Sequence, residues 1–261
     1  MNNKKQNYLG PLIIIGVLFF VFGFVTWVNG TLIAFFKKAF NLDNTSSLLV
    51  TFAFFISYTV MAIPSSEILK KIGFKKGMAV GLGIMAIGTL TFVPAAKMAS
   101  YILFLVGLFV IGIGLTLLQT ASNPYVTILG DRESAAQRIS IMGIANKIAG
   151  ILSQKLLGGL LLASSTVSVA VSSETELDKV TVPYLILTGV LIVLAILIML
   201  SKGLPEVSEE QEGDTSEKSE KTSIWAFPNL VLGLVTLFSY VGLEVISGDT
   251  IISYGISLGF P

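Results

Sequence analysis

The stretch YILFLVGLFVIGIGLTLLQTASNPYVTIL, residues 101–129, decides the fold class. Its first two thirds are almost wholly apolar, and the whole stretch carries no charged residue. A bilayer core needs about 20 mostly apolar residues in each helix that crosses it. We therefore predict a membrane-spanning helix here, and we expect its polar second part, from Gln119 to Tyr125, to face protein or water rather than lipid.

Six further apolar runs of similar length surround this one, and short loops join most of them. They are residues 12–34, 48–69, 77–96, 139–162, 182–200 and 227–258. The composition agrees with these spans, because 53% of the residues are hydrophobic, only 13% are charged, and the mean hydropathy is +0.84. The sequence predicts an all-α, multi-pass membrane protein.

Two residue types are absent from the sequence, and their absence narrows the function. The chain has no Cys and no His, which removes thiol nucleophiles, imidazole bases and most transition-metal ligands. We expect no enzyme activity, no metal and no organic cofactor. The sequence also has no basic stripe that would indicate nucleic-acid binding.

Basic residues in the predicted loops are unevenly distributed between the two sides of the membrane. Placing the N-terminus in the cytoplasm puts most of them inside, as the positive-inside rule requires. The acidic, Ser-rich segment 201–223 is predicted to be a flexible cytoplasmic linker. It divides the chain into a six-span bundle, residues 1–200, and a seventh span within residues 224–261. Residues 163–180 are expected to form an external loop.

Polar residues gather in spans one, four, five and seven, whereas spans three and six are expected to be peripheral. In span four, Gln119 and Asn123 share one helical face, and Pro124 is expected to kink the helix. Two amides on one face suit a polyhydroxylated ligand, since each can donate and accept hydrogen bonds. The alternative is that they only bond a neighbouring helix.

Span one places Trp27 and Asn29 at mid-depth, where an indole is unusual. They predict a cavity wall, although a core tryptophan satisfied by a carbonyl or a close helix crossing at Asn29–Gly30 would also fit. Span five contributes Asn146 and Lys147. Lys147 is either paired with a carboxylate or open to water.

Span seven carries two acids, Glu244 and Asp249. A charge inside the bilayer costs about 2.5–3.5 kcal/mol on insertion scales, so both acids are expected to face a polar interior. They are candidates for coupling transport to H⁺ or Na⁺; a structural ion pair, with Lys147 as the partner, is the alternative.

Six stretches, taken together, carry a family likeness: FGFVTWVNGTLI, LLVTFAFFISY, LKKIGFKKG, GLFVIGIGLTLLQTASNPYVTILG, RISIMGIANKIAG and YVGLEVISGDTIISYGISLG. They resemble the major facilitator superfamily, and within it the fucose permease and glucose/galactose transporter group. The loop between spans two and three is similar to the superfamily's gating signature at Gly73, Lys75 and Lys76. Lys70 stands where many members have an aspartate.

The resemblance implies twelve helices in two halves around a central cavity, with helices one, four and seven lining it. The chain would then hold the N-terminal half and the first helix of the other half, and the missing half would be its partner. Gly30 and Gln119 stand where the proton-coupled fucose branch has acids, so its proton mechanism does not transfer directly. Asn146 matches an asparagine of the family and is the carried-over sugar contact.

We therefore expect a bacterial inner-membrane permease that binds a hexose or related monosaccharide and moves it by alternating access. The predicted sugar contacts are Trp27, Asn29, Gln119, Asn123 and Asn146. Cation-coupled symport through Glu244 and Asp249 is expected. The alternatives are a carrier of another small polar solute or an inactive fragment of such a carrier; a seven-helix receptor, a membrane enzyme and a dimerising half-transporter fit less well.

Overall fold

The computed structural model describes residues 9–130, 132–162, 173–201 and 227–259, together with the single positions 204, 223 and 225. Every regular element in these residues is helical, which confirms the predicted all-α class. The elements are α1 (Leu9–Trp27), α2 (Asn29–Ala39), α3 (Asn44–Ser47), α4 (Leu49–Ile72), α5 (Phe74–Leu90), α6 (Phe92–Lys97), α7 (Tyr101–Ile128), η1 (Arg132–Ser134), α8 (Ala135–Leu161), α9 (Ser173–Leu200) and α10 (Pro228–Ser257).

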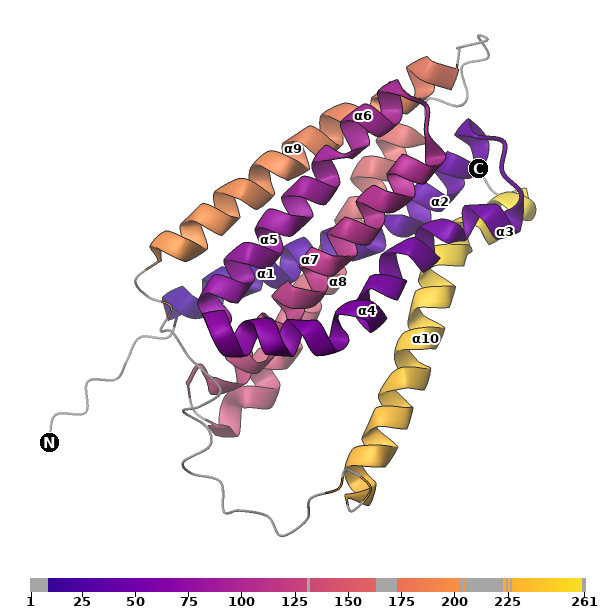
Figure 1. Ribbon diagram of the computed structural model, residues 1–261. Helices are drawn as coiled ribbons and strands as arrows, with labels where there is room; N and C mark the ends of the chain where they lie inside the picture. Colours follow the sequence, from indigo (N-terminus) through magenta and orange to yellow (C-terminus); the bar gives the residue numbers. More distant parts are fainter. Residues whose placement is uncertain are drawn as a thin grey trace, which may run out of the picture.

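Helix α7 lies at the centre of the bundle. It packs along α5 on one side and α4 on the other, while α9 covers α5 and α8 runs along α1 (Figure 1). The α5–α7 approach is close because glycines meet there: a Cβ on Gly114 would lie 2.5 Å from the Gly81 carbonyl oxygen and 2.6 Å from the Met85 nitrogen. Small residues at such contacts let backbones touch and strengthen van der Waals packing in a membrane.

Within the described residues, six helical segments are long and apolar enough to cross a membrane: residues 10–39, 49–72, 74–97, 101–128, 177–200 and 228–257. The predicted fifth span corresponds to α8, which is 27 residues long but is not among them. It carries Arg138, Lys147 and Lys155, and these charges lower its apolarity. Its packing along α1 nevertheless places it in the bundle as a long helix of the same kind.

Three expectations need correction in detail. The first span is two helices, because α1 ends at Trp27 and α2 begins at Asn29. Span three is likewise divided, at Thr91, and α5 is packed between α7 and α9 rather than left at the surface. Span six begins at Ser173, so residues 173–180 of the predicted external loop are helical. Most of the predicted linker lies outside the described residues.

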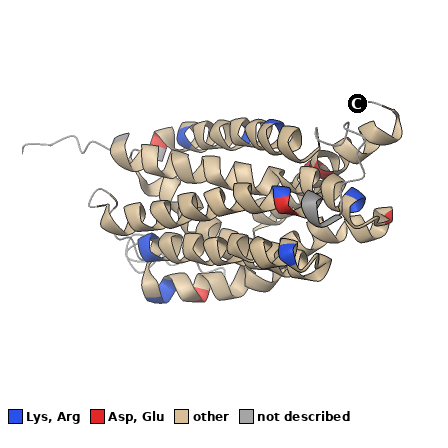
Figure 2. Ribbon diagram, turned by 90° about the horizontal axis from the view of Figure 1, so that it is seen from above, with Lys and Arg blue, Asp and Glu red and all other residues tan. Residues whose placement is uncertain are grey.

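The bundle has two ends, which we name by a residue at each. The Gly73 end contains the α4–α5 junction and the end of α9, which are joined by a hydrogen bond from Lys75 Nζ to the Ser201 carbonyl oxygen (2.6 Å). The Asp43 end contains the α2–α3 junction, where the Asp43 carboxylate accepts a bond from the Ser46 nitrogen and caps α3. The ribbons between the ends are largely uncharged (Figure 2).

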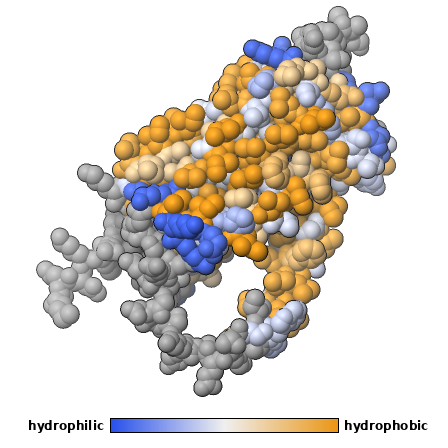
Figure 3. All heavy atoms as spheres, in the orientation of Figure 1, coloured by the Kyte–Doolittle hydropathy of each residue, from blue (hydrophilic) through white to orange (hydrophobic). Residues whose placement is uncertain are grey.

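Helix α10 stands partly apart from the others. Its main contact is with α2, near its C-terminal half, and its N-terminal half is exposed along its length (Figure 1). The surface from the bundle across to α10 is mostly apolar (Figure 3). A chain with so much exposed apolar surface requires a lipid or protein environment.

Candidate functional site

Trp27 is the centre of the polar cluster inside the bundle. Its indole lies between two glycines from different helices: a Cβ on Gly150 of α8 would meet the ring at 2.6 Å, and a Cβ on Gly248 of α10 would overlap it. Its Nε1 donates to Asn146 Oδ1 at 3.4 Å. The ring therefore contacts two other helices, α8 and α10, and its N–H is satisfied by the oxygen of a side-chain amide rather than by a backbone carbonyl.

Asn146 joins α8 to α1 through both ends of its amide. It accepts from Trp27, and its Nδ2 donates to the Phe19 carbonyl oxygen at 3.3 Å. Gly23 of α1 lies directly against the Asn146 backbone, where any side chain would collide. The side chain is half-buried, so it borders open space while its orientation is set by two hydrogen bonds.

Lys147 and Glu244 form an ion pair between α8 and α10. The lysine Nζ also lies 4.4 Å from the centre of the Trp27 ring, a favourable position for a cation over an aromatic face. The two side chains are 49% and 24% exposed, so the pair borders open space. Of the two interpretations of Lys147, the structure favours pairing with a carboxylate.

Asp249 has a different environment, although it lies only five residues further along α10. It is 3% exposed, and its Oδ2 accepts a hydrogen bond from Thr51 Oγ1 of α4 at 2.6 Å. Gly30 of α2 lies against this segment, since a Cβ there would be 3.2 Å from the Gly248 oxygen and 3.5 Å from the Asp249 Cα. Asn29–Gly30 thus does mark a close helix crossing.

Gln119 of α7 adjoins the cluster through Tyr58 of α4, whose hydroxyl lies near the side chains of both Gln119 and Thr26. Because Thr26 precedes Trp27, this group adjoins the one around the indole. Asn123, one turn further along α7, is exposed. It is therefore available to a ligand.

Asn29, the first residue of α2, has a different environment. It is fully buried, and neither its Oδ1 nor its Nδ2 has a hydrogen-bond partner among the described residues. A buried amide without partners is costly. The structure thus does not place Asn29 where a ligand in the cluster would touch it, whereas Trp27, Gln119 and Asn146 are brought together.

The predicted gating loop forms a sharp junction. Gly73 ends α4 and starts α5 with φ 79° and ψ 165°, a left-handed backbone that favours glycine. Its nitrogen donates to the Leu69 carbonyl oxygen at 2.8 Å. Lys75 is tied to the end of α9, as described above, and the exposed Lys76 also has an interaction partner.

Sequence reasoning missed three residues of this network. Tyr58 and Thr51 carry no charge and stand in an apolar run, so no signal marked them except their spacing on α4, seven residues apart and near one face. Arg138 stands just before the predicted fifth span, residues 139–162, where the sequence indicates only a basic loop residue. It is buried, and its guanidinium bonds the Val126 and Thr127 carbonyl oxygens at 3.0 and 2.9 Å and the Ser134 hydroxyl at 2.6 Å, which caps the end of α7.

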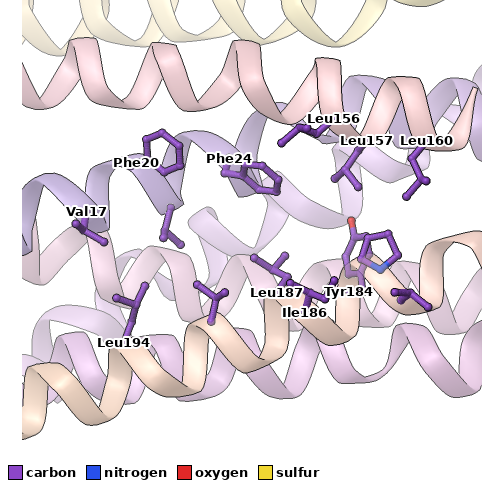
Figure 4. A pocket seen from close by; sticks show the side chains of 14 residues that line it. Val17, Phe20, Phe24, Leu156, Leu157, Leu160, Tyr184, Ile186, Leu187 and Leu194 are labelled. Carbon is purple, nitrogen blue, oxygen red and sulfur yellow. The ribbon is translucent and has the colours of Figure 1, made fainter.

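Two pockets lie apart from the cluster. A groove of about 560 Å³ between α1, α8 and α9 is lined by apolar side chains, with Phe20 and Phe24 opposite Leu187 and Tyr184 (Figure 4). It offers a sugar almost no hydrogen-bonding groups. A smaller pocket of about 360 Å³ lies at the Asp43 end between α2, α3 and α10; Lys37, Asn44, Ser47, Thr250, Ser253 and Tyr254 are among its lining residues.

Comparison with known proteins agrees with this architecture. The family profile of the Major Facilitator Superfamily matches residues 15–261. A glucose/galactose transporter of Brucella abortus (strain 2308) is 39% identical over 252 residues, which cover 97% of this chain and 60% of the relative. An L-fucose-proton symporter of Escherichia coli (strain K12) is 30% identical over 272 residues, 97% of this chain and 61% of the relative.

Among solved structures, the crystal structure of a Major Facilitator Superfamily transporter, FucP, in the outward conformation is similar. The TM-score is 0.65 at 30% sequence identity, over 84% of this chain and 55% of that one. The chain thus spans about 60% of the length of the curated relatives that it matches.

Proposed function

The chain belongs to the Major Facilitator Superfamily, and we propose that it is the sugar-binding part of a monosaccharide permease. Its relatives are transporters, which is consistent with the expectation that it is not an enzyme. We propose hexose transport because of that similarity and because of the hydrogen-bonding groups in the cluster. Because the chain covers only part of each relative, transport itself is proposed for the complete permease.

The observation that carries the proposal is a row of hydrogen-bonding side chains, the bonded pair Asn146–Trp27 beside Thr26, Tyr58 and Gln119, contributed by α8, α1, α4 and α7. Amides and a phenol can each donate to and accept from adjacent sugar hydroxyls, and an indole offers an apolar face to a sugar ring. Asn123 adds an exposed amide one turn away. A hexose bound here would touch helices from both parts of the chain, α1–α8 and α10.

We propose alternating access in which α10 moves relative to the bundle. In the described arrangement α10 rests on α2 at the Asp43 end and diverges from the bundle at the Gly73 end (Figure 1). The similar solved structure is in the outward conformation. With the N-terminus and the Gly73 end in the cytoplasm, the arrangement of this chain corresponds to an inward-open state of an inner-membrane permease.

The domain division follows the same proposal: a six-helix bundle over residues 1–200, a linker over 201–223, and the first helix of a second half from 224 to 261, with the rest of that half as partner. Transport is proposed to be cation-coupled symport. Two relatives are named L-fucose-proton symporters, and since Gly30 and Gln119 cannot titrate, the coupling acids here are sought in α10.

Sugar binding tests the proposal directly, with the purified chain in lipid nanodiscs. The chain has two tryptophans, so Trp225→Phe leaves Trp27 as the sole indole. Glucose, galactose and fucose should change its fluorescence saturably, and Gln119→Ala should weaken the binding of the best sugar by more than tenfold if the amide bonds a buried hydroxyl, about 1.4 kcal/mol or more.

Lys155→Gln is the matched control, because Lys155 is exposed and outside the cluster. If no monosaccharide alters the fluorescence while another small polar solute does, the solute class is wrong and the alternative carrier is correct. If the complete permease in proteoliposomes takes up none of the sugars that bind, the transport function is wrong.

A further inference from the structure

The two acids of α10 lie in surroundings that suit different tasks. Glu244 is paired with Lys147 and partly exposed, so its charge is compensated where it stands. Asp249 is almost fully buried and receives one hydrogen bond, from the neutral Thr51 hydroxyl. An ionised carboxylate in such a place lacks both water and a counter-charge, which is an expensive combination.

No cationic side chain among the described residues reaches Asp249. On α4, the charged residue nearest to Thr51 is Glu67, sixteen residues and about 24 Å of helix away. On α2, residues 29–36 are uncharged, and Lys37 lies seven residues beyond Gly30, bonded to Asn44 of α3. On α8, Lys147 is engaged with Glu244.

The remaining titratable groups near α10 are also accounted for. Asp43, at the start of α3, is exposed and caps that helix. Tyr254 lies five residues beyond Asp249 and is exposed, while Tyr58 lies near Thr26 and Gln119. None of them supplies a positive charge. Among the described residues nothing compensates a charged Asp249, so its carboxyl is neutral there only when it carries a proton.

The position of Asp249 couples its charge to the contact between α10 and the bundle. Gly30 and Gly248 touch beside it, and Thr51 holds its carboxylate from α4, so the group is buried only while α10 rests on α2 and α4. If α10 moves away, the carboxylate becomes hydrated and can ionise at little cost. Docking of α10 and protonation of Asp249 therefore favour each other.

A route for the proton leads from the Asp43 end. The residues that line the pocket there include Ser47, Thr250 and Ser253, and Ser253 follows Asp249 by one helical turn, about 6 Å. The Ser253 hydroxyl oxygen is buried and has no hydrogen-bond partner among the described residues. Four residues apart, Ser253 and Asp249 share one face of α10, so a water in the pocket would be placed to bridge the hydroxyl and the carboxyl.

We propose that Asp249, and not Glu244, binds and releases the coupling proton, and that the protonated carboxyl holds α10 against α2 and α4. A proton from water in the Asp43-end pocket adds to a carboxylate oxygen of Asp249, and the same proton returns to water when α10 moves away. Glu244 and Lys147 remain an ion pair throughout. The proposal rests on the cation-coupled function proposed above and assigns its coupling residue.

The sign of the effect follows from linkage. The docked arrangement binds the proton more tightly than the undocked one, so lowering the pH increases the docked fraction and raising the pH decreases it. Trp27 reports docking, because its ring lies against Gly248 of α10 and loses that cover when α10 leaves.

The test is acrylamide quenching of Trp27 in the Trp225→Phe chain in nanodiscs, measured against pH without sugar. Quenching should be weak at low pH and increase several-fold as the pH rises. Asp249→Asn, a neutral side chain of the same shape, should keep quenching weak at every pH, and Asp249→Glu should restore the pH dependence. Circular dichroism and thermal unfolding establish that each variant is folded.

The double variant Lys147→Gln/Glu244→Gln removes the other pair as a unit and should retain the pH dependence. Loss of the dependence in this double variant, with retention in Asp249→Asn, would overturn the proposal. A response to Na⁺ at constant pH in place of the pH response would overturn the assignment of a proton. Sugar binding measured in the same samples separates either failure from failure of the proposed sugar function.

Discussion

The α5–α7 interface and the α10–α2 contact both bring glycines together, yet they differ in what surrounds the glycines. Between α5 and α7 the glycines are embedded in a long apolar contact, with Gly81 against Gly114 and Gly88 against Ile111. Between α10 and α2 one crossing at Gly30 and Gly248 is flanked by an indole, an ion pair and a buried acid. The first arrangement favours a permanent contact, and the second favours a contact that can be made and broken.

The largest effect is expected from Gly114→Val, which places a bulky side chain in the α5–α7 interface. Even a Cβ would lie 2.5 Å from the Gly81 oxygen, so α5 and α7 would have to separate along much of their length. We expect a loss above about 3 kcal/mol, at the upper end of overpacking costs, seen as a lower unfolding temperature in detergent. Gly83→Val is the control, because nothing lies within 4 Å of its Cβ position. An equal loss of stability in both variants would show that the close contact at Gly114 is not what stabilises the α5–α7 interface.

Arg138→Gln should come next. The guanidinium gives hydrogen bonds to the last turn of α7 and to Ser134, and charged hydrogen bonds contribute about 1.5–3 kcal/mol each when a buried partner is left unsatisfied. We expect a destabilisation of about 2–3 kcal/mol in the same unfolding measurement. Lys155→Gln should leave the unfolding temperature unchanged. A similar loss of stability in that variant would show that the positive charge of Arg138, and not its hydrogen bonds, stabilises the fold.

Gly248→Ala attacks the second contact. The new methyl group would overlap the Trp27 ring, so α10 should leave the bundle while the rest stays folded. We expect a several-fold rise in acrylamide quenching of Trp27 with a stability change below about 1 kcal/mol, since few other contacts are lost. Gly242→Ala, with open space at its Cβ, is the matched control. Unfolding of the whole chain by Gly248→Ala would remove the distinction between the two contacts.

Gly30→Ala should have the smallest effect. Its Cβ would lie 3.2 Å from the Gly248 oxygen, a tight contact that a shift of a few tenths of an ångström relieves. We expect a modest rise in Trp27 quenching, smaller than for Gly248→Ala, and an unfolding temperature within error of the parent chain. A larger effect at position 30 than at position 248 would show that the helix crossing, not the indole, determines where α10 rests.

The sequence predicted the spans well because a bilayer imposes a simple length and polarity rule. It also singled out Trp27, Gln119, Asn146, Lys147 and the two acids, since polar groups in apolar runs are conspicuous. The sequence did not show which side chains on different helices would contact each other. Periodicity along one helix does not say that Thr51 would reach Asp249, that Tyr58 would lie near Gln119 and Thr26, or that Asn29 would be buried without a partner.

The same limit explains the errors in the helices. The break at Val28 is slight, because the Leu32 nitrogen still donates to the Val28 carbonyl oxygen at 3.0 Å. No proline and no pair of glycines in the sequence indicates it. The burial of α5 depends on its glycines, which let the neighbouring helices pack closely against it. Within an apolar run these glycines give no sign of that role. The break in the first span and the burial of α5 are thus determined by packing between helices, not by the residue pattern within one helix.

The indole of Trp27 has a consequence for how this sequence can change over evolutionary time. The two ends of this indole, the Cδ1 side of the pyrrole ring and the Cζ3 side of the benzene ring, fill the space left by the missing side chains of Gly150 and Gly248, which lie on separate helices almost a hundred positions apart in the chain. A larger residue at either glycine is tolerated only if position 27 becomes smaller, and a smaller residue at 27 leaves two hollows. We expect the three positions to vary together among homologues, as a single inherited unit.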